Sequence, residues 1–182
     1  HQEEMAIKRM KLNYEEIITC PRPVAQLWEK LLSPTNTAIP DYPSLALTME
    51  KGVSKQRRGE AWRLLVHARN SMQDAQQCPG SSSRYDDYSL CRQAVDYDQF
   101  PLLDMPYEEL LGQLTSHQHA IIIDLSRTFP TLKYFEASLG PGQLALYNLL
   151  KAYSLLDSQV GYCQGLSFIA GVLLLHLSEN EA

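Results

Sequence analysis

The sequence predicts an all-α fold, and three observations lead to this prediction. Apolar residues recur at helical spacing along most of the chain, whereas the alternation typical of half-buried strands is nearly absent. Pro23 and Pro106 open amphipathic segments, and proline suits the first turn of a helix. Hydrophobic residues make up 45% of the 182 residues, which is enough for the core of an ordinary domain.

Residues 1–50 are predicted to form a helical extension followed by a linker. One helix is expected over residues 2–11 and a second one from Pro23, whose apolar side chains fall on a single stripe. This stripe consists of Val24, Leu27, Trp28 and Leu31. Three prolines within residues 33–44 indicate an irregular connection, so we place the start of the main domain at residue 51.

The main domain, residues 51–182, is predicted to contain further helices and one surface insertion. A helix should begin near Gln56, and another near Pro106. Between them, residues 71–104 are rich in Ser, Asp and Tyr around a Pro-Gly pair, which indicates the insertion. An apolar helix is expected over residues 166–177. The other expected buried faces are Ala61, Trp62, Leu65 and Val66; Leu110, Leu111 and Leu114; and Leu146, Leu149, Leu150, Tyr153 and Leu156.

Composition excludes several classes of protein. A net charge of −5 argues against a dedicated nucleic-acid binder or a polybasic membrane anchor. The four cysteines lack zinc-ligand spacing, so we expect reduced thiols and a cytoplasmic protein. The chain opens with charged residues rather than a signal peptide, and the apolar run over residues 166–177 is too short to cross a bilayer.

The sequence also lacks the motifs of nucleotide-binding and metal-dependent enzymes. It contains no P-loop, G-x-S-x-G, H-E-x-x-H or G-x-G-x-x-G. On a helix, His117 and His119 would point about 200° apart and could not share a metal ion. We interpret them, like His67 and His176, as ordinary surface histidines, and we expect no metal site and no cofactor of the chain's own.

Two short segments could carry chemistry. Ile121, Asp124 and Arg127 follow each other at three-residue spacing, so on a helix they share one face, with Arg127 at the end before a proline. Taken alone, this pattern is most simply a surface ion pair. In the second segment, Gly161 and Gly165 flank a turn that exposes Gln164, whose amide could orient a water molecule but could not act as a base. Taken alone, it is most simply a tight interhelical turn.

Together the two segments point to a shared function. A cation at a helix end can stabilise the charge that develops on a transferring phosphate, and an amide can position the attacking water. A protein with both groups and no nucleotide motif of its own could lend them to a GTPase in trans.

The motifs resemble those of TBC-domain Rab GTPase-activating proteins. The pattern I-x-x-D-x-x-R ends at Arg127, Y-x-Q ends at Gln164, and Arg58 and Trp62 match the opening motif of that domain. Two longer strings, GPGQLALYNLLKAYSLLD and VGYCQGLSFIAGVLLLHLSE, resemble the Akt-substrate subfamily that controls glucose-transporter vesicle traffic. The resemblance covers nearly the whole chain except residues 71–104.

The resemblance implies an all-helical fold and assigns roles to individual residues. Arg127 would be the arginine finger and Gln164 the glutamine finger, while Asp124 and Tyr162 would position them. The partner would be a Rab-family small GTPase that carries the GTP and Mg²⁺. The chain would meet this partner in the cytoplasm or on vesicle membranes. Arg58 and Trp62 would be structural, with the guanidinium stacked on the indole.

The sequence departs from the family in its insertion at residues 71–104, which is longer than expected, and in two further places. Leu132-Lys133 stands where His-Pro is expected, and the chain ends at Ala182, so we expect only the N-terminal helical half of a TBC domain, preceded by a short helical extension. The last apolar helix would then expose an apolar patch. The alternative to an activator is therefore a truncated, non-catalytic Rab-binding or helical interaction module.

Overall fold

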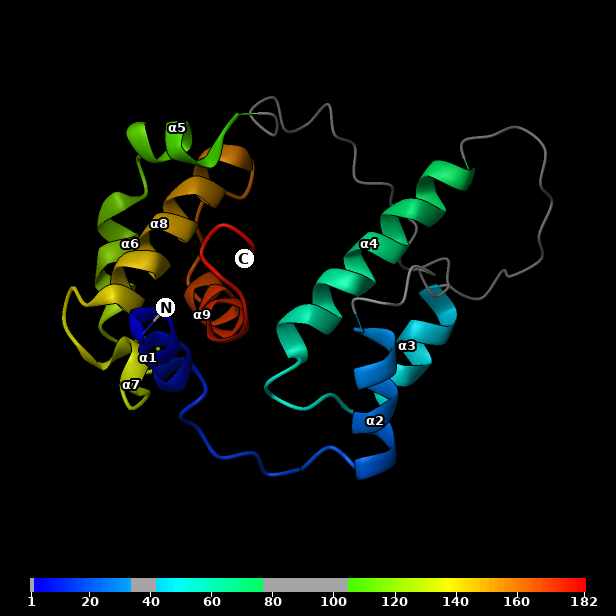
Figure 1. Ribbon diagram of the computed structural model, residues 1–182. Helices are drawn as coiled ribbons and strands as arrows, with labels where there is room; N and C mark the ends of the chain where they lie inside the picture. The colour runs from blue at the N-terminus through cyan, green and yellow to red at the C-terminus, as the bar shows by residue number, and fades with distance from the viewer. Residues whose placement is uncertain (1, 34–41, 77–104) are drawn as a thin grey trace. The chain divides into compact units, whose positions relative to one another are not determined.

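The computed structural model describes residues 2–33, 42–76 and 105–182, and every regular element in these ranges is a helix (Figure 1). The predicted all-α fold is therefore confirmed. The helices are α1 (Gln2–Lys11), α2 (Arg22–Leu31), α3 (Tyr42–Glu50), α4 (Arg58–Gln76), α5 (Tyr107–Gly112), α6 (Gln118–Leu125), α7 (Lys133–Glu136), α8 (Pro141–Leu156) and α9 (Leu166–His176). Within these ranges, no helix has both the length and the apolar character needed to cross a membrane.

The chain packs as two units. The α8 unit comprises His1–Glu15 and Ala94–Ala182, and the α4 unit comprises Glu16–Gln93. This division differs from the predicted boundary after Glu50. The physical reason is packing, because α1 lies against α7 and α9 in the α8 unit, whereas α2 and α3 share a core with α4.

The α4 unit is built around Trp28, which is 1% exposed. Its indole Nε1 donates a hydrogen bond of 3.0 Å to the carbonyl of Gly52, where a φ of +102° suits glycine. Leu45 on α3 is also buried in this core. Helix α3 begins inside the segment expected to be an irregular connection. Pro43 does not prevent this, since it lies in the first turn, where a helix tolerates proline. That part of the linker prediction is wrong.

Helix α4 differs in two ways from its predicted form. Val66, expected on the buried face, is 59% exposed, whereas Ala61 and Ala68 are buried. The helix also continues to Gln76, into the segment predicted as a surface insertion. The rest of that segment, residues 77–104, lies outside the described residues.

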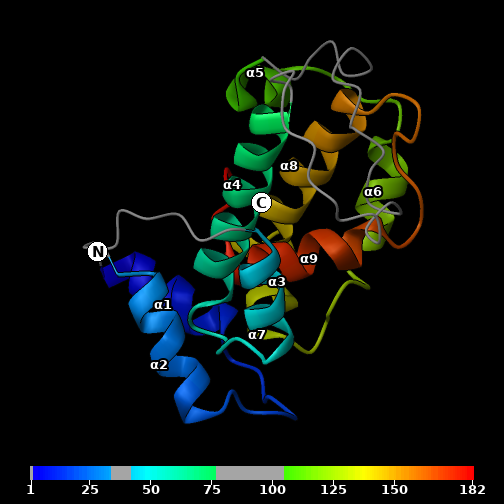
Figure 2. The same ribbon diagram turned by 90° about the vertical axis from the view of Figure 1, so that its right-hand side faces the viewer.

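Helix α8 is the centre of the α8 unit, and α5, α6, α7 and α9 all pack against it. Figures 1 and 2 show α9 crossing α8, with α6 alongside. The predicted final helix is confirmed, with bounds of Leu166–His176. The core of the unit is formed by Ile121, Leu125, Tyr134, Phe135, Ala145, Leu146, Leu150, Ala170, Leu174 and Leu175.

Two predicted buried positions are exposed in the α8 unit. Leu114 is 85% exposed because α5 already ends at Gly112, and Tyr153 is 38% exposed at the solvent side of α8. On α8, small and polar residues such as Gln143 are buried instead. Gln143 satisfies its amide by donating to the carbonyl of Phe135 at 3.0 Å and accepting from the Leu139 amide at 3.0 Å.

The N-terminal helix is joined to the end of the α8 unit by polar contacts. Lys11 donates to the carbonyl of Leu177 at 2.8 Å, and its ammonium lies 5.0 Å from the centre of the Tyr134 ring. Burial lowers the pKa of Lys11, although the acidic side chains of Glu179 and Glu181 oppose this effect. Residues 2–15 therefore form part of the unit that carries the candidate site.

Candidate functional site

The two charged residues predicted to share a helix face lie at the end of α6. Asp124 is 3% exposed in the last turn, and Arg127 lies in the turn that follows the helix. The Arg127 guanidinium forms an ion pair with Asp124 Oδ1, as the spacing predicts. The Arg127 side chain remains 48% exposed, so it can reach a ligand while one oxygen holds it.

The turn that carries Arg127 is shaped by the residues after it. The carbonyl of Asp124 accepts hydrogen bonds from the Thr128 amide at 3.1 Å and from the Thr128 hydroxyl at 2.7 Å. Phe129 then adopts a φ of +49°, which turns the chain away from the helix direction before Pro130. A Cβ at Gly171 on α9 would lie 2.9 Å from the Phe129 ring, so glycine allows this turn to pack closely on α9.

The second predicted segment is the loop between α8 and α9, residues 160–165, which we call the glutamine loop. Asp157 holds its start, because the Asp157 carboxylate accepts a hydrogen bond of 3.1 Å from the amide of Val160. Gly161 and Gly165 have φ angles of +57° and +106°, which favour glycine and form the expected turn. Gln164 lies in this turn and is exposed.

Asp124 connects the two segments. Its Oδ2 accepts a hydrogen bond of 2.5 Å from the Tyr162 hydroxyl, while Oδ1 holds Arg127. Because Tyr162 and Gln164 are two residues apart, their Cα atoms lie within about 7 Å of each other. One buried carboxylate therefore joins the turn that bears Arg127 to the loop that bears Gln164.

The electrostatics of Tyr162 fit its role as a hydrogen-bond donor. Burial raises the pKa of Tyr162 to about 12, and the hydrogen bond to Asp124 acts in the same direction. Two neighbours, Ser167 and Arg127, oppose this effect and lower the pKa of Tyr162 in part. The Ser167 hydroxyl lies near the phenol without completing a hydrogen bond of standard geometry. At neutral pH the phenol keeps its proton and donates a hydrogen bond to the carboxylate.

Arg58 and Trp62 lie in the α4 unit, on the first turns of α4. The Arg58 guanidinium donates to the carboxylate of Glu16 at 2.5 Å and so ties the helix to the segment before α2. Trp62 is half-buried. The contact with Glu16 agrees with a structural role for Arg58, and the stacking of Arg58 on Trp62 stays a prediction.

Two of the four histidines interpreted above as ordinary surface residues are not of that kind. The His176 Nε2 shares a hydrogen bond of 3.0 Å with the Tyr14 hydroxyl, and His117 is half-buried beside the glutamine loop. His67 and His119 are exposed, as expected. Among the residues that the structure describes, no group of three or more His, Cys, Asp or Glu could hold a metal ion.

Sequence reasoning missed two residues that support the site. Thr128 is fully buried and caps the end of α6, and its place four residues after Asp124 is the signal that could have shown it. Ser167 is also fully buried, in the first turn of α9 next to Tyr162. Nothing in its local sequence distinguishes it from a solvent-facing serine.

Comparison with known proteins identifies the family. A family model described as the Rab-GTPase-TBC domain matches residues 55–182. TBC1 domain family member 1 of Homo sapiens is 47% identical over 186 residues, covering 100% of this chain and 14% of that protein. TBC1 domain family member 4 of Mus musculus is 45% identical over 182 residues, covering 100% of this chain and 12% of that protein.

A more distant relative is Rab GTPase-activating protein tbc-11 of Caenorhabditis elegans, which is 31% identical over 163 residues, covering 90% of this chain and 15% of that protein. The chain thus spans only 12% to 15% of the length of these relatives. The resemblance seen in the motifs is confirmed, since the matched region contains both Asp124-x-x-Arg127 and Tyr162-x-Gln164. The chain belongs to the Rab-GTPase-TBC domain family.

Proposed function

We propose that this chain accelerates GTP hydrolysis by a Rab-family small GTPase, with Arg127 as arginine finger and Gln164 as glutamine finger. The observation that carries this proposal is the double contact of Asp124, which holds Arg127 through one oxygen and Tyr162 through the other. Segments that are far apart in the sequence thereby present a cation and an amide from one part of the α8 unit.

The two groups would do different work. The guanidinium of Arg127 would stabilise the negative charge that develops on the phosphate oxygens as the bond to the γ-phosphate breaks. The amide of Gln164 would hydrogen-bond the attacking water and align it, without removing its proton. The partner would bring the GTP and its Mg²⁺, and through a membrane-bound Rab the chain would act in the cytoplasm at vesicle surfaces.

Positioning by Asp124 would lower the entropic cost of this arrangement. An exposed arginine samples many rotamers, whereas an arginine held by a buried carboxylate starts near the required position. Because Asp124 is 3% exposed and Arg127 is 48% exposed, the anchor is fixed in the core while the guanidinium faces the solvent.

Single-turnover GTP hydrolysis with a panel of GTP-loaded Rab proteins tests the proposal. The parent chain should accelerate hydrolysis by at least one Rab. Arg127→Ala should lose roughly 10³-fold or more of that acceleration, because this is the usual contribution of an arginine finger. Gln164→Ala should also reduce it strongly.

Matched controls are available in the same unit. Arg9→Ala and Gln118→Ala remove the same functional groups from exposed positions on α1 and α6, and they should leave the rate unchanged. If Arg127→Ala or Gln164→Ala stimulates hydrolysis as well as the parent does, the assignment of the fingers is wrong.

A second candidate function is a non-catalytic Rab-binding or helical interaction module. It is favoured by the apolar side chains that α9 leaves at the surface, since Phe168, Ile169 and Val172 are 44%, 62% and 41% exposed. Such a module would bind a Rab loaded with a non-hydrolysable GTP analogue but would not accelerate hydrolysis with any Rab. Binding and hydrolysis measured on the same panel separate the two functions.

A further inference from the structure

The glutamine loop contacts the α6 segment at two places. The first is Asp124, near the turn that carries Arg127, and the second lies at the other end of α6. There the imidazole of His117 lies against the backbone of Gly161, which is buried. A Cβ placed on Gly161 would be 2.4 Å from His117 Nε2 and 3.0 Å from Cε1. Because carbon atoms do not approach other atoms this closely, the ring fills the space that a side chain at position 161 would need.

The backbone of His117 is itself anchored. It precedes α6, and its carbonyl accepts a hydrogen bond of 3.1 Å from the Ile121 amide. Its amide donates to the hydroxyl of Thr115 at 3.2 Å, and that hydroxyl shares a hydrogen bond of 2.8 Å with Ser154 on α8. Thr115 and Ser154 are both buried, so the ring of His117 is carried by a backbone that the core holds in place.

The two contacts of the glutamine loop lie at opposite ends of α6. His117 precedes the helix and Asp124 lies in its last turn, seven residues later, which corresponds to about 10 Å along the axis. Gly161 packs on the first and Tyr162 bonds to the second. Two separated contacts restrict rotation of the loop in a way that the Tyr162 hydrogen bond alone does not.

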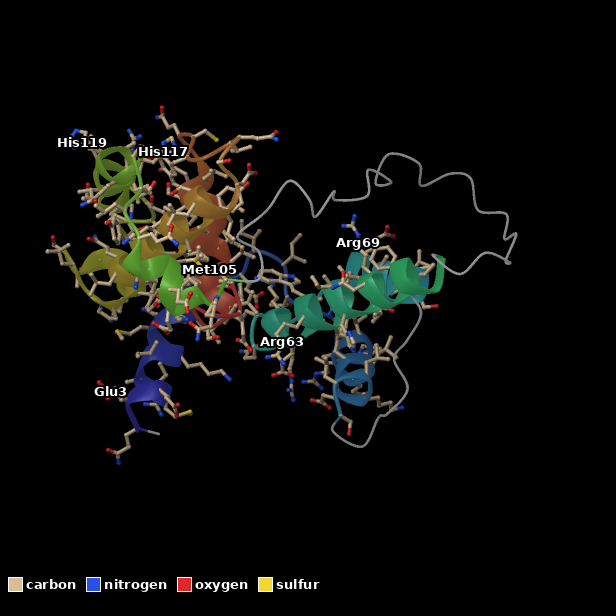
Figure 3. The ribbon with its side chains drawn as sticks, turned by 90° about the horizontal axis from the view of Figure 1, so that it is seen from above. Glu3, Arg63, Arg69, Met105, His117 and His119 are labelled. Atoms are coloured by element: carbon tan, nitrogen blue, oxygen red, sulfur yellow. The ribbon has the colours of Figure 1, made fainter. Side chains whose placement is uncertain are left out.

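We propose that His117 is a positioning residue for the glutamine loop, and that its contact with Gly161 determines the place from which Gln164 reaches the partner's GTP. This inference rests on the proposed Rab GTPase-activating function. His117 itself would touch neither nucleotide nor water. Figure 3 shows His117 and His119 at the start of α6, with His117 on the side nearer the orange segment that follows α8.

The test is a double-mutant cycle between His117→Ala and Gly161→Ala. A methyl group at position 161 would collide with the ring. The ring is half-buried and its backbone is anchored, so we expect the loop to move rather than the ring, and a displacement of about 1 Å can cost 10²-fold in rate. Removing the ring makes room for that methyl group. We therefore expect Gly161→Ala to lower the single-turnover rate by about 10²-fold. His117→Ala should lower the rate less, because the loop loses a support but meets no collision, and the double variant should return to the rate of His117→Ala.

The control is His119→Ala, which removes the same side chain from an exposed position two residues away and should keep the parent rate. Strain from the positive φ at position 161 is present with and without the ring, so the cycle separates it from the contact. If the double variant is as slow as Gly161→Ala, or if His117→Ala is no slower than His119→Ala, the inference is wrong. Should Gly161→Ala fail to fold, folding of the double variant would still support the contact, and failure of both would refute it.

A second readout does not depend on GTPase activity. Cys163 is exposed in the glutamine loop, and with the other three cysteines replaced by serine it can carry a trifluoromethyl probe for ¹⁹F NMR. Gly161→Ala should shift this resonance, the double variant should return it towards the parent position, and His119→Ala should leave it in place. An unshifted resonance in Gly161→Ala would also refute the inference.

The two readouts distinguish the inference from the function on which it rests. If the parent chain accelerates no Rab, the proposed function fails, and the ¹⁹F cycle alone decides whether His117 positions the loop. If Arg127→Ala abolishes an activity that the cycle between His117 and Gly161 does not affect, the function stands and the role of His117 is rejected.

Discussion

The hydrogen bond between Tyr162 and Asp124 leads to the most direct prediction from the structure. Replacing Tyr162 with phenylalanine removes only the hydroxyl that donates to Asp124 Oδ2 at 2.5 Å. The ring keeps its packing, and Arg127 still compensates the charge of the carboxylate. The change in stability therefore reports the hydrogen bond itself.

The magnitude follows from the burial of the two partners. A hydrogen bond to a charged group contributes about 1.5–3 kcal/mol. Since Asp124 is buried but Tyr162 is only half-buried, we expect a value near the lower end, about 1.5–2 kcal/mol. For a chain of this length, that loss lowers the melting temperature by roughly 3–8 °C.

Tyr153→Phe is the matched control. The Tyr153 hydroxyl also donates to an aspartate, Asp157, at 3.0 Å, but on the exposed side of α8. Loss of the Tyr153 hydroxyl should lower the free energy of unfolding by no more than about 0.5 kcal/mol, as is usual for surface substitutions. Any difference between the two variants therefore reflects the buried position of Asp124.

Urea unfolding followed by circular dichroism measures both variants, and Asp124→Asn with the double variant completes a cycle. We expect Tyr162 and Asp124 to be coupled by about 1 kcal/mol. Tyr162→Phe should also reduce the acceleration of GTP hydrolysis by the Rab at least about 10-fold, because the glutamine loop loses its anchor. If Tyr162→Phe is no more destabilising than Tyr153→Phe, Asp124 does not join the two segments and the reasoning fails.

Three further outcomes are expected. Trp28→Ala should destabilise the α4 unit by about 3–5 kcal/mol, measured by urea unfolding, because it empties the centre of that core. Gly142→Ala should lower the melting temperature strongly, since its Cβ would lie 2.0 Å from the carbonyl oxygen of Tyr134, whereas Gly112→Ala meets nothing within 4 Å and should be tolerated. In an alkaline titration followed by tyrosinate absorbance, the difference between the parent and Tyr162→Phe should show a step near pH 12, because the folded pKa is raised to about 12. The unfolded chain loses this proton near pH 10, so the stability that Tyr162 contributes is complete below pH 10 and is lost as the pH rises through 12. A step near pH 10 in the folded protein would contradict the buried hydrogen bond.

The fold class and most of the helices could be predicted from periodicity. The stripe around Trp28 and the apolar run of α9 indicate their helices correctly, because a helix that packs against a core repeats its apolar residues with the period of the backbone. Periodicity does not reveal which parts of a stripe are covered by neighbours. Val66 and Leu114 continue apolar patterns but are 59% and 85% exposed among the residues that the structure describes.

The candidate site shows the same limit. Pairing of Asp124 with Arg127 follows from the geometry of a single helix and its last turn, so it could be derived from spacing alone. The contacts of Tyr162 with Asp124 and of Gly161 with His117 could not. They join residues on segments whose separation is decided by how α6 and α9 pack against α8.

The sequence by itself thus determined an all-helical chain of the TBC family with a candidate cation and a candidate amide, since helical period and local motifs depend on neighbouring residues. Only the tertiary structure decided that Asp124 is buried and shared between Arg127 and Tyr162, and that the ring of His117 lies against Gly161. The physical reason is that hydrogen bonds and steric contacts between distant segments act over a few ångströms. Their partners are therefore selected by the packing of the core rather than by any local pattern.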